Sequence, residues 1–304
     1  MDNRKKNRLT TTLLVAIFLT GLSLLLYPGL SDYWNSFHQS RSVLGYLESV
    51  GTMDTERTDA ILSSARAYNA ALDSGGSRWF LSDEGREAYR SELSFDPDGA
   101  MGVITIEKIH VRLPIYHGTS DAVLQTSIGH LEWTSLPVGG AGSHCVLSGH
   151  RGLPSAKLFS DLDKLVVGDL FTLSVLNETL SYQVDQIRVV EPADVSALQI
   201  VPGEDYCTLL TCTPYAINTH RLLVRGRRVE NPRSEVKVVP DAMAIETIYV
   251  MPFVGVPILL LVLVMLFFST GKYARGVDGC WELRSFRAGH GRRAENNSAK
   301  SADP

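Results

Sequence analysis

The sequence is poor in cysteine and lacks the residue spacing of a metal site. Its 304 residues include four cysteines and eight histidines, and none of these residues has the spacing of a zinc or iron site. His117, His130, His144 and His220 fall in or beside expected strands and turns, which favours structural roles for them. We therefore expect neither a metal nor another cofactor.

The chain also lacks an excess of positive charge and any internal repeat. Lys and Arg number 29 against 33 Asp and Glu, which gives a formal net charge of -4, and no basic block alternates with aromatic residues. Proteins that bind nucleic acid usually carry such a basic patch. The composition therefore predicts no nucleic-acid partner.

Charged residues are absent from the apolar segment Leu9–Ser31. It is long enough to cross the roughly 30 Å hydrocarbon core of a membrane as a helix. The alternative is a cleavable signal peptide, but no Ala-x-Ala-like site follows, and Tyr27, Tyr33 and Trp34 are typical of an interfacial aromatic belt. We predict a retained transmembrane helix over residues 9–30.

A second charge-free segment, Thr247–Gly271, predicts another transmembrane helix over residues 247–270. Its length disfavours the alternative of a buried core helix. Basic residues precede the first segment and follow the second, namely Arg4, Lys5, Lys6 and Arg8, then Lys272, Arg275, Arg284, Arg287, Arg292 and Arg293. By the positive-inside rule both termini are cytoplasmic and residues 32–246 lie outside. The prediction is a two-pass cell-membrane protein.

Between the apolar segments, helical patterns come first and strand patterns follow. Thr58–Leu72 has apolar residues at helical spacing, and Ser82 could cap a second short helix. From Met101 onward, short apolar runs separated by Gly and Pro predict strands over 102–106, 111–115, 143–147, 169–175, 180–190, 206–211 and 221–229. Several close strands of this kind favour a closed or nearly closed β-barrel.

These patterns divide the chain into consecutive parts. We expect a basic cytoplasmic N-terminus (1–8), a transmembrane helix (9–30), a helical extracytoplasmic segment (31–98), a β-barrel (99–231), a linker (232–246), a second transmembrane helix (247–270) and a cytoplasmic tail (271–304).

The candidate chemistry lies at the ends of two predicted strands. The run Tyr206–Leu210 leads to Cys212, Pro214 ends that strand because it cannot donate to a ladder, and the next strand opens with Arg221. Another strand ends at His150, in a turn flanked by glycines. A thiol needs a nearby base or cation to become a nucleophile, and a histidine and an arginine supply both.

The residues around this cysteine resemble the sortase family. Thr208-Leu209-Leu210-Thr211-Cys212 matches the TLxTC signature, and the blocks that follow are similar to those of the pilus-assembling class C branch. Further matching blocks extend upstream, so the resemblance covers roughly residues 99–231. It implies a mainly β fold: a sortase-like closed β-barrel with short helices, preceded by a helical N-terminal segment and flanked by the two transmembrane helices.

The resemblance also implies an activity. Sortases of this class are cysteine transpeptidases that cleave an LPxTG-like sorting signal between Thr and Gly through a thioester. They transfer the product to a pilin lysine amine. In this sequence Cys212 would be the nucleophile, His150 the general acid and base, and Arg221 the oxyanion-stabilising cation. Thr211 and Thr208 are expected to support substrate or oxyanion.

Class C sortases usually carry a lid with an Asp-Pro-aromatic tip over the active site. Here Asp73 is followed by Ser-Gly, and Trp79 comes only after two glycines. Asp73 and Trp79 are candidate lid residues, and the alternative is a plain connector. The departure predicts that small reagents reach Cys212 in the unmodified protein.

Two further cysteines each lie the same number of residues before a candidate catalytic residue. Cys145 precedes His150 by five residues and Cys207 precedes Cys212 by five. If the two strands are parallel neighbours, as a sortase barrel implies, the cysteines lie level, close enough for a candidate disulfide in an oxidising compartment. The alternative is a pair of buried free thiols.

Three other functions are compatible with parts of the pattern. The chain could be a sortase that anchors surface proteins to peptidoglycan, a membrane-bound cysteine hydrolase, or a catalytically silent scaffold. The second apolar segment and the block after Asn218 favour the pilus-assembling branch. The partners expected are pilin or other surface proteins with an LPxTG-like signal, a lysine amine acceptor and the membrane.

Overall fold

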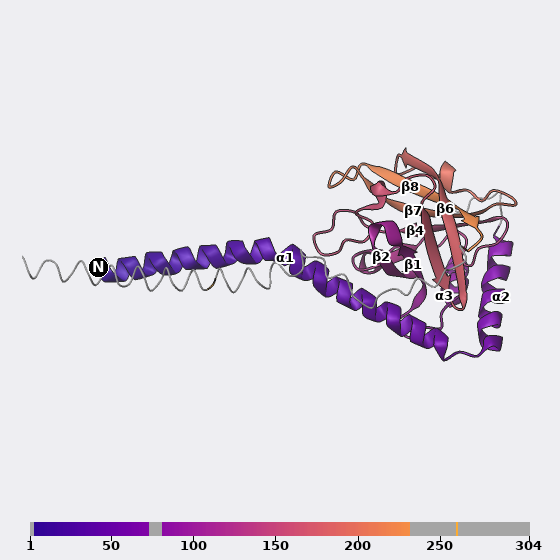
Figure 1. Cartoon of the computed structure of the whole chain (residues 1–304), viewed down its shortest axis with the longest axis horizontal. Coiled ribbons are helices and arrows are strands. Elements are labelled where there is room, and N and C mark those ends of the chain that lie inside the picture. Colours follow the sequence, from indigo (N-terminus) through magenta and orange to yellow (C-terminus); the bar gives the residue numbers. More distant parts are fainter. Residues whose placement is uncertain (1–2, 73–80, 232–259, 261–304) are drawn as a thin grey trace, which may run out of the picture. The chain divides into compact units, whose positions relative to one another are not determined.

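The computed structural model describes residues 3–72, 81–231 and residue 260, and side chains from Thr12 onward (Figure 1). The candidate lid residues Asp73 and Trp79 lie outside the described residues. So do the linker, the cytoplasmic tail and, apart from Leu260, the second apolar segment. The described part shows one helix that is long and apolar enough to cross a membrane, and the two-pass topology stays a prediction.

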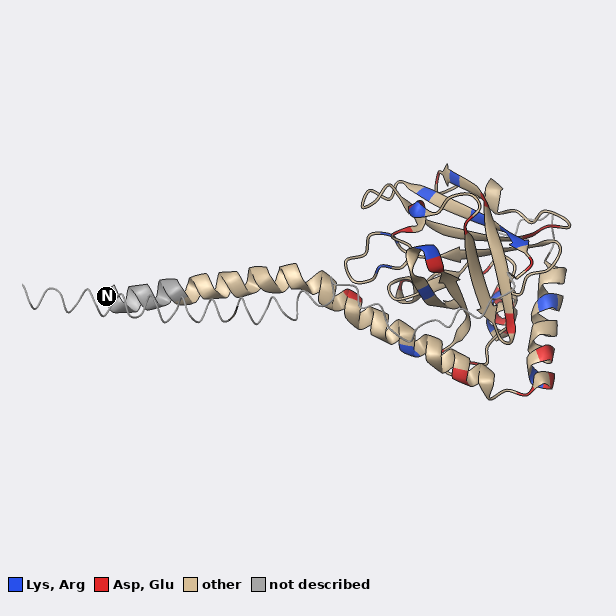
Figure 2. Cartoon of the chain, viewed as in Figure 1, with Lys and Arg blue, Asp and Glu red and all other residues tan. Residues whose placement is uncertain are grey.

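The N-terminal apolar segment is helical, as predicted, but the helix is much longer than expected. α1 runs from Asn3 to Gly51, 49 residues with Pro28 inside it. Between Thr12 and Asp32, α1 carries no charged side chain (Figure 2). α1 continues past the apolar segment. There its residues Val43 and Tyr46 are buried together with Ala100 and Val103 of the barrel, which stabilises the second half of the helix.

Two shorter helices follow, and each has a side-chain cap at its N-terminus. α2 (Thr55–Ala71) is capped by Asp54, which accepts a hydrogen bond from the Arg57 amide at 2.7 Å. α3 (Asp83–Ser91) is capped by Ser82, whose hydroxyl accepts from the Gly85 amide at 3.1 Å. Such caps satisfy one of the free amides of the first turn. The predicted cap at Ser82 is confirmed.

The remaining described chain forms a closed barrel of eight strands, as predicted. The strands are β1 (Ala100–Ile106), β2 (Val111–His117), β3 (Ile128–His130), β4 (Ser143–Ser148), β5 (Leu170–Val175), β6 (Glu178–Val190), β7 (Asp205–Thr213) and β8 (His220–Val229). Their order around the barrel is β1-β2-β3-β4-β7-β8-β6-β5. The short helices between them are η1 (Glu107–Ile109), α4 (Asp121–Leu124), η2 (Leu162–Lys164) and η3 (Ser196–Leu198).

The two faces of the barrel wall carry separate apolar clusters. Cys207, Leu209 and Val224 belong to the large cluster that fills the barrel. Leu223 belongs to a smaller cluster with Val146, Val190 and Leu198, and Leu131, Trp133, Ala197 and Leu210 pack against it. Because successive strand residues point to opposite faces, the smaller cluster lies on the outer face of β4, β7, β8 and β6.

The half-buried His117 and the buried His130 and His144 contact other parts of the fold, which agrees with the structural role expected for them. The ring of Tyr89 from α3 contacts the ring of His117 edge-on and stacks on the ring of His130, with centroid distances of 5.1 and 5.6 Å. The Tyr89 hydroxyl lies 2.9 Å from His130 Nδ1. α3 is therefore fixed to β2 and β3 through one aromatic side chain.

His144 on β4 is buried in its neutral form. Its Nδ1 lies 2.8 Å from the Gln199 carbonyl, which can only accept, so Nδ1 carries the proton. Nε2 is then the acceptor for the Thr208 hydroxyl at 2.7 Å. Burial, which disfavours the charged ring, lowers the pKa of His144 to about 4, and the positive charge of Arg225 acts in the same direction.

We expect this histidine to make the fold less stable in mild acid. An unfolded histidine takes up a proton near pH 6.5, whereas His144 in the fold does so only near pH 4, so stability is retained above pH 6.5 and falls between these values. By pH 4.5 the loss is roughly 2–3 kcal/mol. Urea unfolding of the protein at pH 7 and pH 4.5 measures it. His144→Gln should show a smaller pH difference, and an unchanged difference would contradict the assignment.

Candidate active site

The three residues expected to carry the chemistry lie at the same end of three neighbouring strands. β4 and β7 are parallel and pair up to Ser148 with Leu210. The Gly149 amide continues this ladder by donating to the Leu210 carbonyl at 3.1 Å, and His150 follows directly. On the other side of β7, Cys212 pairs with Arg221 of antiparallel β8.

All three side chains are half-buried, and Cys212 faces outward. Along β7 the buried residues Leu209 and Thr211 alternate with the half-exposed Leu210 and Cys212. Leu209 belongs to the barrel interior, so Cys212 shares the outer face with Leu210. Arg221, as the direct cross-strand partner of Cys212, lies on the same face.

Backbone groups orient the arginine. Arg221 Nη1 lies 3.3 Å from the Asn218 carbonyl and 3.2 Å from the His220 carbonyl. The turn before β8 makes this possible because Asn218 has a φ of 61° and Ala216 a φ of 64°. The left-handed conformation is one that asparagine adopts more readily than most residues. The guanidinium is thus held beside the start of β8, where Cys212 is its neighbour.

The two threonines make hydrogen bonds inside the barrel wall, and their expected support of substrate or oxyanion stays a prediction. Thr211 is fully buried, and its hydroxyl donates to the Gly149 carbonyl at 2.7 Å. Thr208 is 1 % exposed and donates to His144. Thr211 therefore fixes the residue before His150 against the residue before Cys212, and Thr208 fixes β7 against β4.

The chain folds back tightly after His150. The Phe159 amide donates to the His150 carbonyl at 3.1 Å, and the Gly152 amide donates to the Ser160 hydroxyl at 3.1 Å. Gly149 has no room for a side chain, because a Cβ there would lie 2.6 Å from Ile128 Cδ1 and 2.8 Å from the Phe159 ring. Close packing against these two side chains sets the direction in which the chain enters His150.

Arg151 is a residue of the site that the sequence reading missed. Its side chain is 9 % exposed and forms an ion pair with Asp163. Nη1 lies 3.3 Å from the Thr213 hydroxyl, and the guanidinium carbon lies 5.9 Å from the centre of the Tyr215 ring. Arg151 therefore joins the segment that carries His150 to the segment that follows Cys212. Its position directly after His150 was the only sequence signal.

Cys145 and Cys207 are directly paired across β4 and β7, so the register expected for them is confirmed. In the structure both are buried free thiols within hydrogen-bonding reach of each other, and the candidate disulfide is not formed. Burial raises the pKa of the Cys207 thiol well above its usual range. A buried neutral thiol is inert compared with an exposed thiolate.

The part of the chain that the structure describes holds no cluster of three or more His, Cys, Asp or Glu side chains that could bind a metal ion. Within that part, the chemistry available at the site is that of a thiol, an imidazole and a guanidinium. These three groups together suit acyl transfer through a thioester.

Comparison with known proteins points to one family. Residues 104–229 match the Sortase domain. The crystal structure of sortase C1 from Streptococcus agalactiae is 56% identical and superimposes with a TM-score of 0.62, covering 63% of this chain and 100% of that one. The chain belongs to the class C sortases. The family consists of cysteine transpeptidases.

Other relatives agree. Sortase C-1 from Actinomyces oris is 46% identical with a TM-score of 0.54, covering 57% of this chain and 99% of that structure. Among curated proteins, sortase SrtE1 from Streptomyces coelicolor is 33% identical over 178 residues, which are 54% of this chain and 49% of that protein. This sortase thus spans about half the length of that curated relative.

We expect Arg151 to position the catalytic pair. Arg151→Ala should lower kcat about 10-fold with little change in KM, because small shifts of reacting groups are costly while substrate contacts stay. Arg151→Lys should recover only part of the lost kcat, since the ammonium group of lysine cannot replace the planar guanidinium of arginine. Lys164→Ala is the control, because the exposed Lys164 follows Asp163 directly in the sequence but forms its ion pair with Asp161 at 2.9 Å. If the loss of activity in Arg151→Ala equals the loss of folded protein, Arg151 has a structural role only and the prediction is wrong.

Thiol labelling tests the burial of the three described cysteines. In the folded protein a small alkylating reagent should modify Cys212 and spare Cys145 and Cys207, because only Cys212 is partly exposed. After unfolding without reductant, all three should be modified, as read from peptide masses. Protection of Cys145 and Cys207 until reduction would reveal a disulfide. Labelling of Cys212 only after a change at Asp73 or Trp79 would reveal a lid.

Proposed function

We propose that this sortase is a membrane-anchored transpeptidase that joins pilin subunits through isopeptide bonds. The observation that carries the proposal is the placement of Cys212 and Arg221 as cross-strand partners, with His150 at the end of the next strand. One solved relative, sortase C of Streptococcus pneumoniae, is 44% identical with a TM-score of 0.57, and its structure is described as informative on pilin substrate specificity.

The proposed reaction has two half-steps. In the first, Cys212 Sγ attacks the threonine carbonyl of an LPxTG-like sorting signal, and the bond to glycine breaks as His150 gives a proton to the leaving amine. Arg221 stabilises the negative charge on the carbonyl oxygen. The product is a thioester on Cys212 and a released glycine-terminated fragment.

In the second half-step a pilin lysine amine attacks the thioester carbonyl. His150 takes the proton from the amine, the carbon–sulfur bond breaks, and Cys212 is regenerated as an isopeptide bond forms. The apolar cluster on the outer face, with Leu210 and Leu223 next to Cys212 and Arg221 along their strands, offers a surface for the apolar residues of the signal.

The proposed location is outside the cell membrane. α1 supplies an N-terminal helix of sufficient length and hydropathy for an anchor, and such a helix together with a Sortase domain fits a membrane-anchored surface enzyme. An anchored enzyme meets membrane-held substrates at a raised effective concentration without needing tight binding. The second anchor over residues 247–270 and a cytoplasmic position for both termini belong to the same proposal.

The decisive experiment compares joining with hydrolysis. The full chain in detergent is mixed with an LPxTG peptide and a lysine-containing pilin peptide, and products are identified by mass spectrometry. Isopeptide-joined product supports the proposal. Exclusive hydrolysis with abundant lysine peptide present would identify a cysteine hydrolase instead, and preference for a cell-wall precursor amine over lysine would identify a sortase that anchors proteins to peptidoglycan.

Substitutions in the site should separate the three roles. Cys212→Ala should abolish the thioester, and His150→Ala and Arg221→Ala should each lower turnover about 100-fold or more. Arg225→Ala is a matched control for Arg221, because Arg225 lies on the same face of β8 but binds Asp185 at 2.7 Å. Thioester detected in Cys212→Ala, or an equal loss in Arg225→Ala, would contradict the assignment.

A further inference from the structure

α1 is bonded to the loop that carries the catalytic histidine. Asp32 Oδ1 accepts a hydrogen bond from the Lys157 amide at 2.9 Å, and Asn35 Nδ2 donates to the Ser155 carbonyl at 2.8 Å. Asp32 and Asn35 are three residues apart and therefore lie on one face of the helix. Both bonds are made to the backbone, so they fix the course of the loop rather than one mobile side chain.

The loop held in this way is the one closed onto His150. It leaves the barrel at His150 and returns at Phe159, whose amide donates to the His150 carbonyl at 3.1 Å. Phe159 is fully buried. A displacement of Ser155 or Lys157 would therefore be passed through only a few ordered residues to the backbone of His150.

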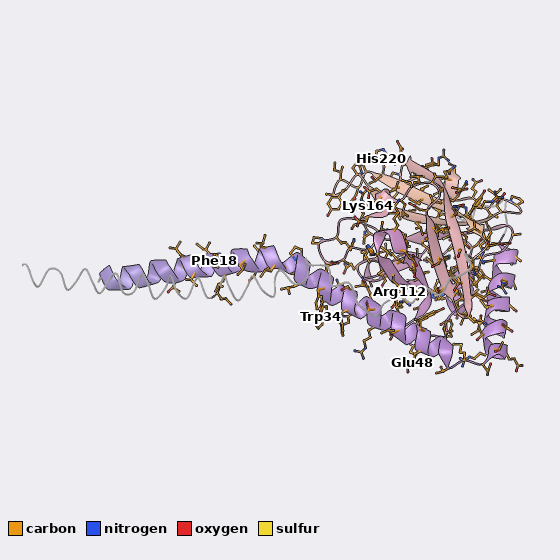
Figure 3. The ribbon with its side chains drawn as sticks, viewed as in Figure 1. Phe18, Trp34, Glu48, Arg112, Lys164 and His220 are labelled. Carbon is orange, nitrogen blue, oxygen red and sulfur yellow. The ribbon has the colours of Figure 1, made fainter. Side chains whose placement is uncertain are left out.

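The opposite face of the same helical turns is aromatic. Trp34 is 64 % exposed and Phe37 58 %, and Tyr33 is 46 % exposed. At 100° per residue these three lie roughly opposite Asp32 and Asn35. Figure 3 shows Trp34 on the side of α1 turned away from the barrel.

The aromatic face begins where the apolar segment ends. The charge-free run ends at Ser31, and a helix rises about 1.5 Å per residue, so Trp34 lies about 5 Å and Phe37 about 9 Å beyond it. The headgroup layer on each side of a bilayer is roughly 5–8 Å thick. Trp and Tyr are enriched in that layer because their rings have an apolar body and a polar edge.

We propose that the turn Asp32–Asn35 of α1 binds the lipid headgroup layer through Tyr33 and Trp34 and holds the histidine loop at that height through Asp32 and Asn35. The inference rests on the proposed anchoring by α1. It adds the coupling of this interfacial turn to the histidine loop through two positioning residues, Asp32 and Asn35, which does not follow from the anchor itself.

Depth-dependent quenching tests the lipid contact. The full chain and its Trp34→Phe variant are reconstituted in phosphatidylcholine vesicles that carry bromine near the headgroups or deep in the acyl chains. The fluorescence that Trp34→Phe removes should be quenched by shallow bromine more than by deep bromine. Leu44 is also 64 % exposed but lies about 20 Å beyond Ser31, so Trp placed there by Leu44→Trp in the Trp34→Phe variant should not be quenched.

Kinetics test the coupling to the loop. Asp32→Leu should lower kcat for the LPxTG peptide about 10-fold with KM unchanged, whereas Asp32→Asn keeps an acceptor oxygen and should retain activity. Gln39→Ala is the matched control, because Gln39 Nε2 donates from α1 to the Thr126 carbonyl at 2.6 Å, in a loop that does not carry His150.

The outcomes separate the inference from the proposed function. The reconstituted sample is also centrifuged in a density gradient. Failure of the full chain to float with the vesicles would contradict the anchoring by α1 and with it the proposed location. If the chain floats but the fluorescence of Trp34 is not quenched, the lipid contact alone is overturned. Equal quenching in the Leu44→Trp variant would overturn it as well. Full activity in Asp32→Leu would overturn the positioning role, and loss in Asp32→Asn equal to that in Asp32→Leu would do the same.

Discussion

The parallel pairing of β4 with β7 is the constraint on which the site depends. It sets Cys145 level with Cys207 and Ser148 level with Leu210, and this register decides which residues lie next to His150. A slip of one residue would turn every side chain of β7 to the other face and point Cys212 into the barrel. Two bonds to Gly149, from Thr211 Oγ1 and to the Leu210 carbonyl, prevent such a slip at the catalytic end.

Most of the barrel could be predicted from the sequence, because seven of its strands are apolar runs bounded by Gly or Pro. β3 was missed since it has only three residues, Ile128–His130, with a glycine in the middle. The length of α1 was also missed. Its second half has a mixed sequence whose helical face becomes evident only once Val43 and Tyr46 are seen to pack against β1.

The site was predictable where a motif carries it and unpredictable where contacts are distant. The placement of His150, Cys212 and Arg221 at neighbouring strand ends could be read from the strand pattern and the sortase resemblance, and their catalytic roles stay a prediction. The hydrogen bonds of Thr208 and Thr211 could not be read in this way, because they depend on partners in β4 and on which face of β7 is covered. The bond from Asp32 to the Lys157 amide joins residues 125 positions apart, and no local pattern reports such a contact.

The outward direction of Cys212 has a consequence for what the barrel can control. The interior is filled by side chains, so the barrel serves as a rigid wall and gives the acyl group no chamber in which to be shielded. A thioester formed on this wall is open to whatever nucleophile reaches the outer face of β7 and β8, be it an amine or water. The choice between them therefore depends on segments and partners above that face rather than on the barrel core.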